Sequence, residues 1–194
     1  MRSGGLALLC ALALLPPARA APPPAHTHRM ERLMALLAHR RHRTATFVEE
    51  DYLRALTRPL SSSGVLVYAA PARLEEHILE PRRITLIADH GVLSATRAGH
   101  TYRMRLGAHA RIAPYIDALR EILSGNRAAL ARRFKLSLSG TLARWTLTLR
   151  PREPPRSPIR RIRIEGARAD IRSVAIAKTN GDHSRMTLGP APGR

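Results

Sequence analysis

The chain has 194 residues and a formal net charge of +19, because 33 lysines and arginines are set against only 14 acidic residues. This length allows one domain with a substantial core. The single cysteine, Cys10, excludes a disulfide within the chain and a cysteine metal site. Arginine used as an ordinary solvated surface residue explains most of this charge, and the functional interpretation is attraction to acidic partners, either anionic lipid head groups or nucleic acid.

The first twenty residues have the pattern of a cleaved secretory signal. Arg2 supplies a positive charge, residues 6–15 are apolar, and residues 18–20 (Ala-Arg-Ala) offer small side chains at the cleavage positions. The apolar run is too short to span a bilayer, which needs about 20 residues. A lipoprotein signal that uses Cys10 is disfavoured, because a bulky leucine precedes it. We therefore expect cleavage after Ala20 and a soluble protein of the bacterial periplasm, and export argues against nucleic acid as its partner.

Two segments have the period of an amphipathic helix. Apolar residues recur at three- and four-residue steps in Met30–Arg43 and in Ile112–Leu123, and a short helix is expected at Arg127–Arg133. No internal repeat or domain linker is found between them. We divide the chain into a signal peptide at 1–20, a proline-rich spacer at 21–29, a single domain at 30–189 and a tail at 190–194.

Alternating apolar and polar residues predict about eleven short strands. We expect them at Phe47–Leu56, Val65–Ala70, Leu74–Leu79, Ile84–Asp89, Val92–Arg97, His100–Leu106, Phe134–Ser139, Arg144–Arg150, Ile159–Glu165, Ala169–Ala177 and His183–Leu188. The serine-rich residues 59–64 are expected to form a turn. Strands and helices do not alternate, so the sheet should be antiparallel, and eleven twisted strands curl strongly. We predict a mainly β (α+β) fold in which helices cover the concave face of this sheet.

Motifs that carry chemistry are missing from the sequence. There is no G-x-S-x-G and no glycine-rich phosphate loop, and the nine histidines are scattered without carboxylates at ligand spacing. The neighbouring acids of Glu49-Glu50-Asp51 and of Glu75-Glu76 alternate between strand faces, so neighbours cannot pair as acid and base. We expect them to balance part of the arginine excess. The prediction is a protein without enzymatic activity, metal or cofactor.

The apolar interior has two interpretations. Strand Val65–Ala70 is apolar on both faces, and each face therefore needs cover. An ordinary packed core is one interpretation, and a cavity for acyl chains between the concave face and helix Ile112–Leu123 is the other. Each buried CH₂ of such a chain is worth about 0.8 kcal/mol. Our candidates for the cavity wall are Leu66, Tyr68, Leu86, Ile116, Leu119, Trp145, Leu147 and Leu149, and a one-residue bulge would invert the facing of a strand.

The order of short motifs resembles the LolA-type outer-membrane lipoprotein carriers over nearly the whole chain after the signal. These motifs are F-x-E-x-x-Y-L at Phe47–Leu53, S-S-G-x-L-x-Y at Ser62–Tyr68, P-x-x-L-E at Pro71–Glu75, I-x-x-x-G-x-L at Ile87–Leu93 and G-D-x-S-x-M-x-L at Gly181–Leu188. The resemblance implies an unclosed β-barrel lidded by helices. Its apolar cavity would take acyl chains of lipoproteins from an inner-membrane exporter and pass them to an outer-membrane acceptor.

One departure places the chain in a divergent LolA-related branch. Carriers of this family commonly have an arginine before the proline that ends the second long strand, whereas Ala70 precedes Pro71 here. The cargo could therefore be a glycolipid or another lipid. We expect a monomer whose surface arginines attract it to anionic membranes. The alternative hypothesis is a non-catalytic interaction or structural module of the envelope with a filled core.

Overall fold

The computed structural model describes residues 25–109, 113–154 and 157–192, so the predicted signal peptide and Ile112 lie outside the described residues. The helices are α1 (Ala25–His39), α2 (Ala113–Leu123) and α3 (Arg127–Arg133), with a 3-10 turn at Leu106–Ala108. The strands are β1 (His42–Tyr52), β2 (Leu60–Ala69), β3 (Arg73–Glu80), β4 (Ile84–Asp89), β5 (Val92–Arg97), β6 (His100–Arg105), β7 (Phe134–Thr141), β8 (Arg144–Pro151), β9 (Ile159–Ala167), β10 (Asp170–Lys178) and β11 (His183–Leu188).

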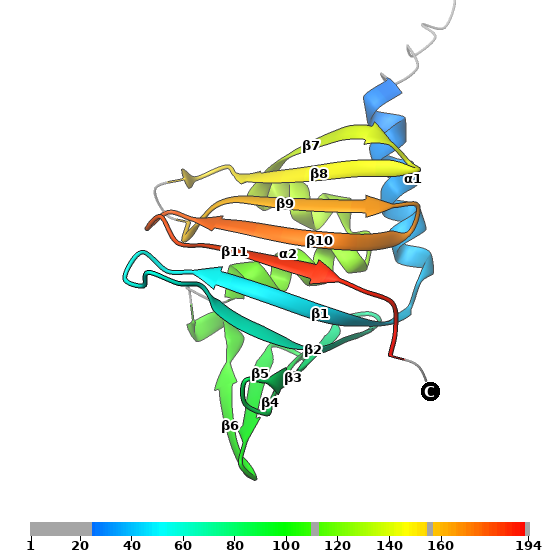
Figure 1. Cartoon of the computed structure of the whole chain (residues 1–194). Helices are drawn as coiled ribbons and strands as arrows, with labels where there is room; N and C mark the ends of the chain where they lie inside the picture. The colour runs from blue at the N-terminus through cyan, green and yellow to red at the C-terminus, as the bar shows by residue number, and fades with distance from the viewer. Residues whose placement is uncertain (1–24, 110–112, 155–156, 193–194) are drawn as a thin grey trace, which may run out of the picture.

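All eleven strands form one antiparallel sheet in the order β6-β5-β4-β3-β2-β1-β11-β10-β9-β8-β7. Neighbours in the sheet are also neighbours in the chain, except that β1 pairs with β11, from Phe47 opposite Leu188 to Tyr52 opposite His183. The first and last strands of the domain therefore meet at the centre of the sheet (Figure 1). Strands β6 and β7 remain as edges, so the sheet is open. This architecture confirms the predicted fold class.

The helices lie on one side of the curved sheet. In Figure 1, α2 lies behind β9, β10 and β11, and α1 runs past the ends of β7 to β10. Helix α2 contacts both α1 and α3, and α1 and α3 both contact β7. The α2 helix has an apolar face, on which Ala118, Ile122 and Leu123 are buried. The helical layer thus covers the concave face, as the sequence predicts.

The interior beneath β8 is a packed core. Trp145, Leu147 and Leu149 alternate along β8 and are at most 1% exposed. The Trp145 indole Nε1 donates a hydrogen bond to the Arg168 carbonyl at 3.0 Å. A side chain on Gly166 would collide with the Trp145 ring, which is why this position holds a glycine. Removing such a buried leucine typically costs about 2–5 kcal/mol of stability.

Several boundaries differ from the sequence predictions, and the differences in α1 and β1 are among the largest. Helix α1 begins at Ala25 and ends at His39, whereas Met30 and Arg43 were expected. Strand β1 begins at His42 because it pairs there with Ala69 of β2. Cross-strand pairing with a long neighbour stabilises an extended backbone where helical periodicity would continue the helix.

The serine-rich segment also differs from its prediction. The expected turn at 59–64 belongs largely to β2, which begins at Leu60 and pairs Ser61 with Glu50 of β1. Serine and glycine favour turns locally, but the ladder with β1 satisfies their backbone groups here. Gly64 lies so close to the backbone of His77 on β3 that a side chain would not fit. The connection between β1 and β2 is made instead by residues 53–59.

Candidate functional site

A cavity of about 530 Å³ lies between the concave face of the sheet and α2. Its volume is within the range of about 300–1,000 Å³ that is typical of ligand pockets. Apolar side chains of β2, β3, β9, β10 and β11 form most of the sheet side of the wall: Leu66, Leu74, Ile164, Val174, Ile176 and Met186. Helix α2 closes the other side with Tyr115, Ile116, Leu119 and Ile122.

The register of the strands explains why these side chains share one face. Leu66 on β2 lies opposite Ala45 on β1 and opposite Glu76 on β3. Residues directly opposite one another in an antiparallel ladder point to the same face of a sheet. The same rule places Val174 of β10 with Met186 of β11. The cavity wall therefore follows from the pairing of the central strands.

The eight predicted wall residues divide into two groups. Leu66, Tyr68, Ile116 and Leu119 line the cavity. Trp145, Leu147 and Leu149 belong to the packed core, because β8 lies beside β7, the strand on which α1 and α3 pack. Leu86 packs against the core on β4, next to Glu76, and is also outside the wall.

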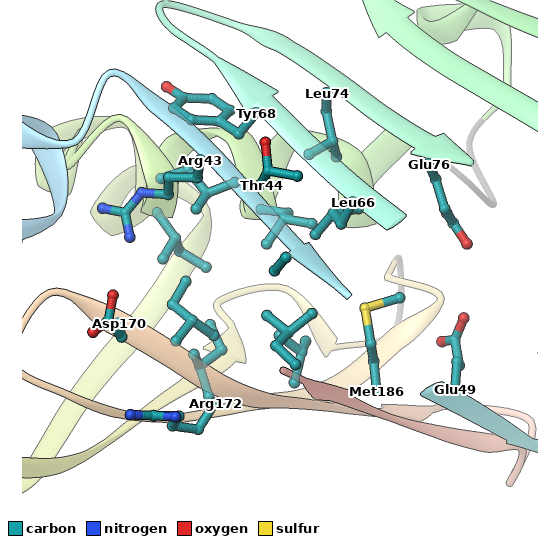
Figure 2. A pocket seen from close by; sticks show the side chains of 18 of the residues that line it. Arg43, Thr44, Glu49, Leu66, Tyr68, Leu74, Glu76, Asp170, Arg172 and Met186 are labelled. Atoms are coloured by element: carbon teal, nitrogen blue, oxygen red, sulfur yellow. The ribbon is translucent and has the colours of Figure 1, made fainter. Parts of the chain in front are cut away.

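Positively charged side chains gather at one end of the cavity. Figure 2 shows Arg43, Asp170 and Arg172 together at this end. Arg43 Nη1 donates to the carbonyl of Ala169 and Nη2 to the carbonyl of Leu37, both at 2.6 Å. Its guanidinium thereby ties β1 to the last turn of α1 and to the turn between β9 and β10. Asp170 pairs with Arg40 at 2.7 Å.

Two carboxyl groups mark the opposite end. Glu49 of β1 and Glu76 of β3 lie near Met186, on facing parts of the wall (Figure 2). Burial, with the nearby charge of Asp51, raises the pKa of the Glu49 carboxyl, against a hydrogen bond with Ser184 that lowers it. Burial raises the pKa of Glu76 to about 7, and the negative charges of Glu49 and Asp51 contribute to that rise.

The sequence analysis missed both groups as parts of the site. It assigned the acids of β1 and β3 to balancing arginines, which holds for Glu75 because Arg73 Nε lies 2.7 Å from Glu75 Oε1. Glu76, however, shares its strand face with Leu74, which is buried. The sequence did contain a signal for Glu76, because an acid stands there at a position where the alternation of the strand calls for an inward-facing apolar residue. Such a carboxyl group loses water on folding.

The described residues include neither a candidate metal site nor a candidate membrane-spanning helix. Among residues 25–109, 113–154 and 157–192, no group of three or more histidine, cysteine or acidic side chains is arranged to hold a metal ion. No helix within the same ranges is both long and apolar enough to cross a membrane.

The open, curved antiparallel sheet, the helices on its concave face and the apolar cavity between them agree with the predicted LolA-like architecture. The family model described as "Outer membrane lipoprotein carrier protein LolA-like" matches residues 21–193. The chain therefore belongs to this family, as the resemblance of its motifs predicts.

Three solved structures are similar to this chain at low sequence identity, each with a TM-score below 0.5. A LolA superfamily protein from Nitrosomonas europaea is 7% identical, with 87% of this chain and 94% of that chain covered and a TM-score of 0.44. The MucA/MucB complex of Pseudomonas aeruginosa is 14% identical, with 85% of this chain and 59% of that chain covered and a TM-score of 0.43. LprF from Mycobacterium bovis is 11% identical, with 90% of this chain and 97% of that chain covered and a TM-score of 0.40. A comparison with curated protein sequences finds no match.

Proposed function

We propose that this protein is a periplasmic carrier that shelters acyl chains of lipoproteins or other lipids in its cavity during transit toward the outer membrane. The main support for this proposal is the cavity of about 530 Å³ between the sheet and α2 in a member of the LolA-like family. Burying apolar chains there removes them from water at about 0.8 kcal/mol per CH₂. The role needs no chemistry from the protein, only a wall that hydrocarbon can contact.

The carrier's cargo would arrive from an inner-membrane exporter and leave to an outer-membrane acceptor. The signal-like first twenty residues and the net charge of +19 support export and attraction to anionic membrane surfaces. Attraction of this kind is screened by salt. Sedimentation with vesicles of anionic phospholipid should therefore fall as the salt concentration rises, and binding that is indifferent to salt would refute the electrostatic part.

A cavity-filling substitution tests the proposal directly. Ile116 lies on α2 and lines the cavity, so Ile116→Trp should fill part of it and weaken the uptake of a fluorescent fatty acid. Ala128→Trp introduces the same side chain at an exposed position of α3 and serves as the matched control. The control should bind the probe as the unchanged protein does. Failure of all three proteins to take up any acyl probe would favour the alternative, an envelope interaction or structural module.

A further inference from the structure

Glu76 is an acidic group of the cavity wall that has no compensating partner among the described residues. Its neighbours across the two flanking strands are apolar, Leu66 on β2 and Leu86 on β4. In the part of the chain that the structure describes, Glu76 makes no hydrogen bond or ion pair. A carboxylate removed from water without a partner is costly, so groups of this kind concentrate at functional sites.

The groups that face Glu76 increase this cost. Its electrostatic neighbours are the carboxylates of Glu49 and Asp51 on β1. Lys178 of β10 offsets charge at Glu49 and Asp51 and is not among the groups that act on Glu76. From α2 the wall presents Tyr115, Ile116 and Leu119, and from β11 it presents Ser184 and Met186.

The other charges of β3 lie on its opposite face. Glu75 accepts from Arg73 at 2.7 Å and bonds His77 Nε2 at 2.9 Å. Side chains at successive strand positions point to opposite faces, so this cluster does not reach the inner carboxyl. Glu76 is therefore left with apolar neighbours and acids.

We propose that occupancy of the cavity by an acyl chain is coupled to a proton on Glu76, so that the protein holds the chain with this carboxyl neutral and releases it on ionisation. This inference rests on the proposed function and assigns a regulation to the same site. Hydrocarbon that covers an ionised carboxylate removes its remaining water, which is far more costly than covering the neutral acid. Binding therefore takes up a proton, and the affinity falls as the pH rises.

The size of the effect follows from the pKa of Glu76 in the empty protein, which is about 7. If the occupied cavity accepts only the neutral acid, apparent affinity scales with the neutral fraction of the empty protein. That fraction falls about tenfold between about pH 6 and pH 8. The dissociation constant for an uncharged acyl-like ligand should rise by about the same factor.

Fluorescence titration with N-phenyl-1-naphthylamine tests the coupling, because this apolar probe does not change its charge between about pH 6 and pH 8. The unchanged protein should bind it about tenfold more weakly at the upper pH. Glu76→Gln, which imitates the neutral acid, should bind with nearly the same affinity at both. Glu49→Gln removes a neighbouring negative charge and should move the midpoint to lower pH. Glu80→Gln, at an exposed position of the same strand, should behave as the unchanged protein.

The outcomes separate this inference from the proposed function. Strong binding by the unchanged protein at a constant affinity across the range overturns the proton coupling and leaves the carrier proposal standing. Affinity for the probe that rises with pH also overturns it. A Glu76→Gln protein whose affinity keeps the full pH dependence also overturns the proton coupling. Absence of binding at every pH refutes the carrier proposal itself. Far-ultraviolet circular dichroism at each pH shows that each protein is folded.

Discussion

The unpaired carboxyl of Glu76 should make the empty protein less stable as the pH rises. Its pKa is about 7 in the folded protein against 4.5 for an ordinary glutamate. Between these values the folded protein binds more protons than the unfolded chain, so stability falls with pH through this window and levels off above it. Each pKa unit is worth about 1.4 kcal/mol, so the ionised group costs the folded state about 3 kcal/mol at about pH 8.

Glu76→Gln isolates this cost, because glutamine keeps the shape of the neutral acid and cannot ionise. The free energy of unfolding, measured by urea denaturation, should rise by about 3 kcal/mol relative to the unchanged protein at about pH 8. At about pH 5 the gain should be less than about 1 kcal/mol, since the folded Glu76 is neutral there. Glu49 and Asp51 titrate in both proteins, so their contributions largely cancel in the comparison.

Two results would refute this reasoning. An equal change in stability at both pH values would mean that the substitution acts through packing and not through the charge. A loss of stability at the higher pH would mean that ionised Glu76 is compensated in the folded protein. Glu80→Gln, at an exposed position of the same strand, should change the unfolding free energy by less than about 0.5 kcal/mol at either pH.

Three further substitutions test other parts of the structure. Arg43→Met removes the guanidinium hydrogen bonds to the carbonyls of Leu37 and Ala169 and should cost about 1–3 kcal/mol in thermal or urea unfolding; an unchanged melting temperature would contradict the tie between α1 and β1. Trp145→Phe removes the 3.0 Å bond to the Arg168 carbonyl and should cost about 1–3 kcal/mol in the same assay, whereas full stability would mean that this bond contributes nothing. Leu147→Ala should cost about 2–5 kcal/mol but leave probe affinity within about twofold, because Leu147 is outside the cavity wall. A large loss of affinity in a folded Leu147→Ala protein would mean that the cavity extends under β8.

Local periodicity was sufficient to predict most elements of the fold. Strands β4, β5 and β11 and helix α3 have the predicted bounds, because each has a clear alternation or helical period between turn residues. The end of α1 was not predictable in this way. Residues 40–43 continue its helical pattern, but the partner strand β2 reaches far enough to pair with His42. A contact with a residue distant in the sequence decided that boundary.

The sequence predicted which residues lie on the inner face of the sheet but not which of them line the cavity. Alternation correctly placed Leu66 and Leu147 on the inner face, yet only Leu66 lines the cavity. The two residues differ in how closely the helices approach their part of the sheet. The alternation of residues within one strand does not predict this distance. The facing positions of Glu49 and Glu76 likewise depend on the curvature of β1, β2 and β3 together.

The most direct test of the carrier proposal is native mass spectrometry of the full chain purified from the envelope of a bacterial host. We predict a bound species whose added mass is that of a lipid with acyl chains, released on denaturation and identified by fragmentation. The Ile116→Trp protein, purified in parallel, should carry much less of it. Unoccupied protein in every preparation, together with no binding of added lipid, would contradict the existence of an acyl-chain site between the sheet and α2.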